Sequence, residues 1–163
     1  MKLLRLFLPV LLAIAASAIA AAPGSPAPGL SLPAASGEAV DIGKLRGKVV
    51  YVDFWASWCG PCKRSFPWMN EMNRKYADKG LAIVAVNVDK KRADAERFLA
   101  VTPAQFTVVY DHAGATPAAW QVKAMPTSYL VDASGKVVFV ESGFRDEHKD
   151  DVEQRIRAAL GVR

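Results

Sequence analysis

The chain has 163 residues, of which 52% are hydrophobic and 23% are charged, and its formal net charge is +5. This length suits one domain of about 100–150 residues with an extension, and the composition is typical of a globular rather than a disordered protein. Basic and acidic residues are interspersed, so the charge argues against nucleic acid as a partner.

The N-terminus has the pattern of an export signal. Lys2 and Arg5 precede an apolar run, and residues 18–20 fit an A-x-A cleavage signal. We therefore expect residues 1–20 to be a signal peptide. An uncleaved anchor helix is the alternative, because residues 6–22 reach the lower limit for crossing a bilayer. Both possibilities predict an exported protein, which in a bacterium means a periplasmic one.

Residues 21–33 are rich in Pro, Gly, Ala and Ser, which predicts a flexible linker before a domain over residues 34–163. A hairpin-like entry over residues 36–48 precedes Val49–Ala56, an apolar run typical of a buried strand. The later pattern predicts helices over 60–78, 93–101, 116–121 and 146–160, and strands over 81–89, 107–110, 127–132 and 136–142. Strands that alternate with helices and end in a hairpin predict an α/β sandwich with a mixed sheet.

Cys59 and Cys62 are the only cysteines of the chain, and they lie at the predicted junction between the first central strand and the first helix. At a helix N-terminus, unpaired backbone N–H groups and the helix dipole favour an anion. The thiolate is the nucleophile of thiol–disulfide exchange, so a lowered pKa of Cys59 would activate it near neutral pH. Cys62 lies one turn further into the helix and can close a disulfide.

Other uses of a CxxC pair fit this sequence poorly. A zinc site needs four ligands, and the remaining candidates, His112 and His148, have no ligand-like spacing. Lys63 follows the second cysteine, so the pair is not a CxxCH haem attachment signal. A purely structural disulfide would stabilise little, because it closes a very short loop. We therefore expect neither a metal nor another cofactor.

Residues 52–62 resemble the active-site strand and loop of thioredoxins. Pro67 falls where thioredoxins kink the active-site helix, and residues 125–127 resemble the cis-proline loop of that family. Residues 41–48, the export signal and the helix-strand segment near 91–110 resemble the exported TlpA/ResA branch. The resemblance implies a thioredoxin fold, with three α/β/α layers, a mixed central sheet, an N-terminal extension and a helix-strand insertion.

The resemblance also implies roles for individual residues. Cys59 would attack a substrate disulfide, and Cys62 would resolve the mixed disulfide and end in a Cys59–Cys62 disulfide. The acid that corresponds to Asp53 in thioredoxins lies behind the inner sulfur and takes its proton, and burial should raise its pKa. Many TlpA/ResA members instead carry Glu at the position of Ser65, so this chain departs from its branch there.

Two loops are expected to contact substrate, by the same resemblance. The active-site loop surrounds the cysteines, and the cis-proline loop brings backbone beside the nucleophile, where a substrate strand can pair. Their residues are Trp58, Gly60, Pro61, Met125, Pro126 and Thr127.

The sequence therefore predicts an enzyme, a monomeric thiol–disulfide oxidoreductase that reduces protein disulfides. Thioredoxin, which shares the Gly-Pro dipeptide, has a reduction potential of about −270 mV, whereas that of the oxidant DsbA is about −120 mV. The resemblance implies a membrane thiol–disulfide transporter as electron donor, and cytochrome c maturation as one possible use. The alternatives are a disulfide oxidase or isomerase and, from a different class, a copper metallochaperone.

Overall fold

The structure, a computed structural model, describes residues 21–162. The predicted signal peptide, residues 1–20, lies outside the described residues. Within them, no helix combines the length and the apolar character needed to cross a membrane.

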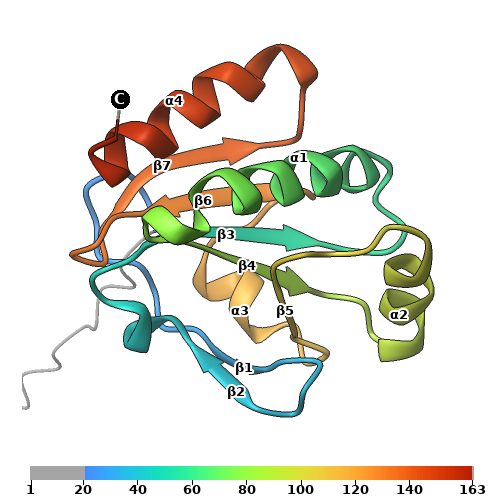
Figure 1. The fold of residues 1–163 in the computed structure, drawn as a ribbon. Coiled ribbons are helices and arrows are strands. Elements are labelled where there is room, and N and C mark those ends of the chain that lie inside the picture. The colour runs from blue at the N-terminus through green and yellow to red at the C-terminus, as the bar shows by residue number, and fades with distance from the viewer. Residues whose placement is uncertain (1–20, 163) are drawn as a thin grey trace, which may run out of the picture.

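A five-stranded sheet in the order β5-β4-β3-β6-β7 forms the centre of the fold (Figure 1). β3 pairs in parallel with β4, and β4 pairs in parallel with β5. β6 is antiparallel to both β3 and β7. The sheet is therefore mixed, and the predicted α/β sandwich is confirmed. In chain order the elements are β1 (Ser31–Pro33), β2 (Ala39–Asp41), β3 (Val49–Trp55), α1 (Gly60–Tyr76), β4 (Leu81–Asn87), α2 (Arg92–Val101), β5 (Thr107–Tyr110), α3 (Ala115–Ala119), β6 (Thr127–Val131), β7 (Val137–Ser142) and α4 (Lys149–Leu160).

The boundaries differ from the predicted ones by a few residues at element ends. After Tyr76 the first helix tightens into a 3-10 turn, Ala77–Lys79, which Gly80 ends at a φ of +101° that a side chain would oppose. The last helix begins with a 3-10 turn, Asp146–His148, before α4. Strand β4 stops at Asn87 rather than at Asp89.

Two apolar clusters pack as layers against the sheet, one on each face. All seven residues of β3 are buried, so this strand contributes side chains to both layers. One layer joins alternate β3 residues such as Tyr51 and Trp55 to α1, α2 and α4. The other joins Val52 and Phe54 to Trp120, which follows α3, and to the segment that precedes β3. The predicted stripe of Phe66, Met69, Met72 and Tyr76 on α1 is buried in the first layer.

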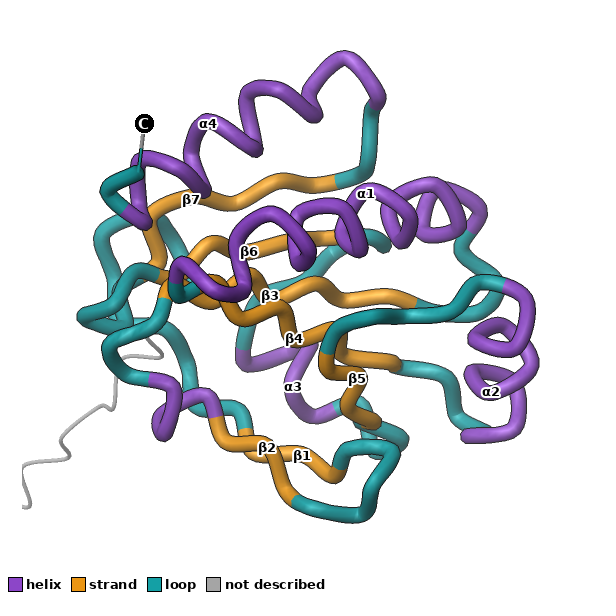
Figure 2. The backbone as a smooth tube through the Cα atoms, viewed as in Figure 1, coloured by secondary structure: helices purple, strands orange, loops and turns teal. Residues whose placement is uncertain are grey.

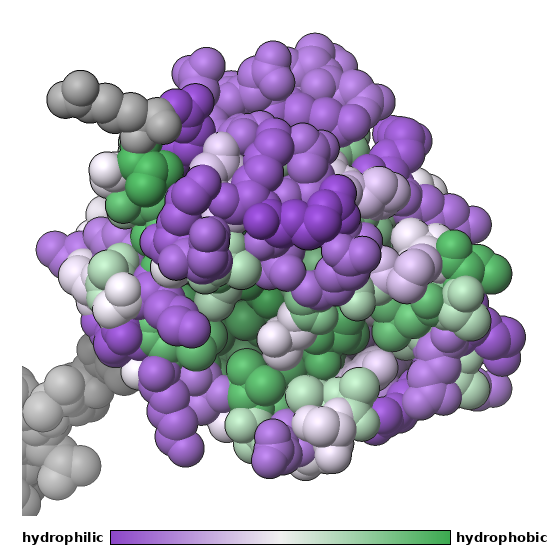
Figure 3. Space-filling model, viewed as in Figure 1, coloured by the Kyte–Doolittle hydropathy of each residue, from purple (hydrophilic) through white to green (hydrophobic). Residues whose placement is uncertain are grey.

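The backbone views show the same arrangement, with α1 and α4 on one side of the sheet and α3 and β1–β2 on the other (Figure 2). Hydrophilic residues cover the upper part of the molecule, where α4 and α1 lie (Figure 3). These two helices therefore bury one face and leave the other in solvent, as their amphipathic sequences predict.

The segment predicted as a flexible linker, residues 21–33, differs most from expectation. Gly24 donates a backbone hydrogen bond to Val137, and Val137 donates one to Ser25. Ala27 likewise donates to Gly135, and Leu30 is buried. The composition predicted no regular structure, but the backbone groups of this segment are satisfied by the β6–β7 hairpin instead of by water. In the structure the segment is therefore held against the sheet.

Candidate active site

The active-site loop leaves the carboxyl end of β3 and enters α1. Cys59 is the N-cap of α1, and its Sγ accepts a hydrogen bond of 3.3 Å from the backbone N–H of Cys62. The two sulfurs form a disulfide with an S–S distance of 2.09 Å. The strand-to-helix placement that the sequence predicted for this pair is confirmed. A sulfur at this position faces the positive end of the helix dipole, which stabilises a thiolate.

The two sulfurs differ in accessibility. Cys59 is 4% exposed, whereas Cys62, in the first turn of α1, is completely buried. Trp58, which precedes Cys59, is 71% exposed and forms an apolar rim beside it. Trp55, by contrast, is fully buried against Phe66. Cys59 is therefore the more accessible of the two cysteines to an incoming disulfide.

Asp53 lies in the middle of β3 and is completely buried. It faces the layer that contains both cysteines, because it alternates with Tyr51 and Trp55 along the strand. The Ser128 hydroxyl donates a 2.7 Å hydrogen bond to Oδ1, and Oδ2 has no hydrogen-bond partner among the described residues. Burial raises the pKa of Asp53 to about 7, although the hydrogen bond from Ser128 opposes the rise. Asp53 can therefore gain or lose a proton at neutral pH.

Ser65 occupies the position where related sequences were expected to carry an acid. Its hydroxyl donates a 3.0 Å hydrogen bond to the backbone oxygen of Cys62, and the side chain is buried. A serine in this state is not a base at neutral pH.

The cis-proline loop lies at the same end of the sheet as the cysteines. The Met125–Pro126 peptide is cis, which confirms that expectation. Thr127, the first residue of β6, pairs with Phe54 near the end of β3, so the loop before it adjoins the active-site loop. The Thr127 hydroxyl donates to the Ala124 oxygen at 2.7 Å. Met125 packs partly buried against the apolar cluster that includes both cysteines.

The sequence analysis missed the groups that hold the active-site loop. Asp89 is buried beyond the end of β4. Its carboxylate accepts hydrogen bonds from the Ser57 backbone N–H at 2.9 Å and from the Ser57 hydroxyl at 3.0 Å. The side-chain amide of Asn87 donates a third, at 2.8 Å. The sequence signal for this role is the acidic residue Asp89 at the end of the strand predicted over residues 81–89, next to the active-site strand.

We expect Asp89→Ala to lower the free energy of unfolding by about 2–4 kcal/mol, because three buried or partly buried donor groups lose a charged acceptor. Urea denaturation monitored by tryptophan fluorescence measures the change. Asp78→Ala is the matched control, since Asp78 is exposed and has no such contacts. Equal stability of the two variants would show that Asp89 does not anchor the loop.

The two histidines lie in separate places. His112 Nδ1 contacts the backbone oxygen of Asp89 at 2.9 Å, and His148 Nδ1 contacts Glu141 Oε1 at 2.8 Å. Within residues 21–162, no group of three or more His, Cys, Asp or Glu side chains is arranged to hold a metal ion.

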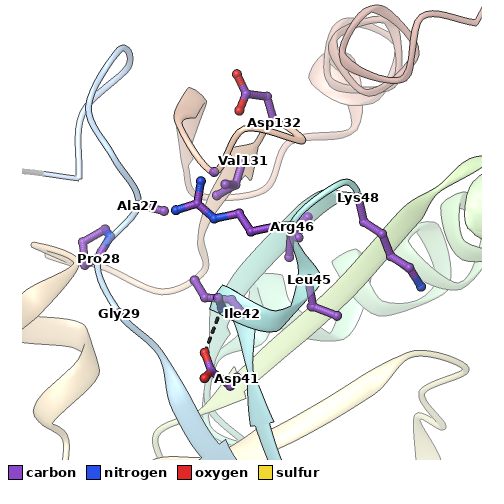
Figure 4. Close-up of a pocket in the computed structure, with 13 residues that line it drawn as sticks. Ala27, Pro28, Gly29, Asp41, Ile42, Leu45, Arg46, Lys48, Val131 and Asp132 are labelled. Carbon is purple, nitrogen blue, oxygen red and sulfur yellow. Dashed lines mark hydrogen bonds between the residues drawn. The ribbon is translucent and has the colours of Figure 1, made fainter.

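A cavity of about 160 Å³ lies at the opposite end of the sheet, near the start of β3 (Figure 4). Arg46 and Asp132 are among its lining residues, and none of the predicted site residues is. Gly135 in the adjoining turn has a φ of +81°, a backbone conformation that residues with a side chain rarely adopt, which explains the glycine there. The cavity is therefore separate from the thiol chemistry.

Comparison with known proteins agrees with this geometry. The Redoxin family model matches residues 22–156. The thiol-disulfide oxidoreductase ResA of Bacillus subtilis is 36% identical over 124 residues, which cover 76% of this chain and 69% of the relative. ResA of Geobacillus thermodenitrificans is 34% identical, over 85% of this chain and 79% of the relative.

Solved structures give the same result. A structure described as a candidate thiol:disulfide interchange protein DsbE from Chlorobium tepidum matches with a TM-score of 0.84 and 53% identity, over 86% of this chain and 99% of the other. The thioredoxin domain of a thiol-disulfide oxidoreductase from Bacteroides vulgatus matches with a TM-score of 0.75 and 26% identity, over 83% and 98%. The chain therefore belongs to the Redoxin family, and it is a thioredoxin-like thiol–disulfide oxidoreductase of the TlpA/ResA type.

Proposed function

We propose that this enzyme acts as a reductase of protein disulfides, with Cys59 as the nucleophile. The observation that carries the proposal is the position of Cys59, the more exposed sulfur, as N-cap of α1 with the Cys62 N–H directed at it. This arrangement stabilises a thiolate at the sulfur that a substrate can reach.

The reaction transfers two electrons in two exchange steps. The Cys59 thiolate attacks a substrate disulfide, forms a mixed disulfide and releases one substrate thiolate. Cys62 then loses its proton and attacks the Cys59 sulfur, which releases the second substrate thiolate and leaves the Cys59–Cys62 disulfide. The substrate ends as a dithiol, and the enzyme ends in the oxidised state that the structure shows.

Asp53 is the proposed acceptor of the Cys62 proton. Its Oδ2 is the atom available for that proton, because Oδ1 already accepts from Ser128. A carboxyl group whose pKa is about 7 can accept a proton and release it again at neutral pH.

Substrate contact is assigned to the two loops that meet at this end of the sheet. Trp58 offers an exposed apolar ring, and Gly60 and Pro61 border the nucleophile. Met125, Pro126 and Thr127 form the facing loop, beside which an extended substrate segment can pair through its backbone.

The proposed setting is the periplasm, with residues 1–20 as a signal peptide or uncleaved anchor. An oxidising compartment keeps a CxxC pair as a disulfide unless a reductant is supplied. A membrane thiol–disulfide transporter is therefore the proposed electron donor, and apocytochrome c cysteines are one proposed substrate, as the resemblance to the TlpA/ResA branch implies. We propose that the enzyme works as a monomer.

The reduction potential of the Cys59–Cys62 pair tests the direction of electron flow. We expect a value at or below about −250 mV after equilibration with dithiothreitol or glutathione buffers at neutral pH. A value between about −120 and −180 mV would instead identify an oxidase or isomerase and contradict the proposal.

Asp53→Asn tests the proton acceptor. We expect the variant to resolve the mixed disulfide about 10²-fold more slowly than the wild type at pH 7, because no carboxylate takes the Cys62 proton. The difference should shrink above about pH 8.5, where a thiol ionises without help. Acid quenching and mass spectrometry measure the rate, with the exposed Asp78→Asn as control. A wild-type rate at pH 7 would remove Asp53 from the mechanism.

A further inference from the structure

A row of polar side chains crosses the otherwise apolar face of the sheet beside Asp53. Asp53 on β3 pairs in register with Ser128 on β6, and Ser128 pairs with Glu141 on β7. Residues that pair directly across neighbouring strands project from the same face. The row leads away from the cysteines, towards the edge of the sheet at β7.

The phenol of Tyr51 lies between the two ends of this row. Tyr51 is two residues before Asp53 on β3, faces the same layer, and is buried. Burial and the Asp53 charge raise its pKa, a hydrogen bond with the Ser128 side chain lowers it, and the Glu141 charge raises it. Tyr51 is therefore coupled to Asp53, Ser128 and Glu141 at once.

A small cavity joins this phenol to the surface. Tyr51, Glu141 and His148 all line it, below α1 and α4. The cavity has a volume of about 10 Å³, which is the lower limit for one water molecule. A water there can bridge the Tyr51 phenol and the Glu141 carboxylate. Glu141 accepts a 2.8 Å hydrogen bond from His148, and the two side chains are 15% and 36% exposed. The row therefore ends in solvent.

The other ionisable groups around the row are few. Arg145 and Lys149 also line the cavity, and Lys149 pairs with Asp146. On the other side of Asp53, β4 presents Ala85, which carries no charge. The covering helix α1 contributes the Cys62 sulfur and apolar side chains to this layer.

We propose that Ser128, Tyr51, Glu141 and His148 form a proton relay that connects buried Asp53 with solvent on the side away from the substrate. The inference rests on the proposed role of Asp53 as proton acceptor. A docked protein substrate would cover the loops around Cys59 and with them the direct path for a proton. The relay leaves by the α1–α4 side and stays open while substrate is bound.

Protons balance at each step of the relay, and no electrons move. Rotation of the Asp53 carboxyl places its proton on Oδ1, from which it passes to the Ser128 hydroxyl. Ser128 passes a proton to the Tyr51 oxygen, and the phenol proton crosses one water to the Glu141 carboxylate. His148 exchanges that proton with solvent. Ser128 and Tyr51 each receive one proton and pass one on, so each ends with one hydroxyl proton as before, and they act as positioning residues that work through Asp53.

Two conservative substitutions interrupt the relay. Tyr51→Phe removes only a hydroxyl, and Glu141→Gln keeps the shape of the side chain. Glu147→Gln is the matched control, because Glu147 is an exposed acid of the adjoining 3-10 turn. The probe is a folded protein that carries one accessible disulfide, and the readout is the rate of mixed-disulfide resolution as a function of pH, with Asp53→Asn measured in parallel. Thermal unfolding of each variant verifies its fold.

We expect Tyr51→Phe and Glu141→Gln each to slow resolution by about tenfold near pH 7, less than the loss for Asp53→Asn. Their rates should converge on the wild-type rate above about pH 8.5, where the thiol ionises by itself, whereas a structural defect would slow the reaction at every pH. A wild-type rate for either variant, with Asp53→Asn still slow, overturns the relay and leaves the proposed function intact. A wild-type rate for Asp53→Asn overturns both.

Discussion

Cys59→Ser should abolish disulfide reduction, while Cys62→Ser should stop the reaction after its first step. Cys59 is the more exposed of the two cysteines, and it is the one that caps the N-terminus of α1. A serine hydroxyl is not ionised at neutral pH and cannot replace the thiolate. Without Cys62, the bond between Cys59 and the substrate has no internal thiol to attack it, so the mixed disulfide should accumulate.

Non-reducing electrophoresis and mass spectrometry distinguish the two variants. Cys62→Ser should gain the mass of one disulfide-linked peptide substrate for each protein molecule, and Cys59→Ser should gain none. Dithiothreitol should release the peptide. The order of the two sulfurs is wrong if Cys59→Ser is the variant that traps substrate. Asp78→Asn, an exposed substitution away from the loop, is the control that should still form the Cys59–Cys62 disulfide.

Asp53→Asn should make the folded protein more stable at alkaline pH. Burial raises the pKa of Asp53 from 3.8 to about 7 in the folded state. Between these values the folded protein holds a proton that the unfolded chain has lost, so the stability of the wild type falls as pH rises. Above pH 8, where the whole shift has taken effect, the ionised Asp53 lowers the free energy of unfolding by about 4 kcal/mol. The neutral amide avoids this loss, because it never becomes charged.

Urea denaturation of the oxidised proteins at pH 5 and pH 8 measures this effect. We expect the advantage of Asp53→Asn over the wild type to be larger at pH 8 than at pH 5. Asp111→Asn is a control of opposite sign. Burial raises the Asp111 pKa, but hydrogen bonds from Thr116 and neighbouring backbone lower it by more, so the pKa lies below its usual value. The charge of Asp111 therefore stabilises the fold at neutral pH. A variant at Asp53 that is less stable than the wild type at pH 8 would contradict the raised pKa.

Much of the fold could be predicted from local pattern alone. The apolar run over β3 and the helical spacing of Phe66, Met69 and Met72 identified the active-site strand and helix correctly. These signals are short-range: they depend on which face of one element is apolar, and the residues that carry them are neighbours in the chain. The CxxC pair could be predicted for the same reason. Its chemistry depends on the helix N-terminus, which is formed by residues next to it in the chain.

The ends of helices and strands and the structure of the N-terminal segment were harder to predict from the sequence. Helix termini depend on caps and turns that compete over one or two residues, as at Tyr76 and Gly80. Gly24, Ala27 and Leu30 carry a sequence typical of a linker, and only the nearby β6–β7 hairpin supplies the partners that hold them.

The sequence by itself predicted the nucleophile and the resolving cysteine and determined the alternation of strands and helices, because these predictions follow from residue types at fixed short spacings. Only the tertiary structure decided that Ser128 lies against Asp53, that Asp89 holds Ser57, and that Glu141 meets His148 below α4. Ser128 is 75 residues from Asp53 along the chain. Contacts of that range are set by strand order and register, and both emerge only when the apolar faces of all the elements are buried together.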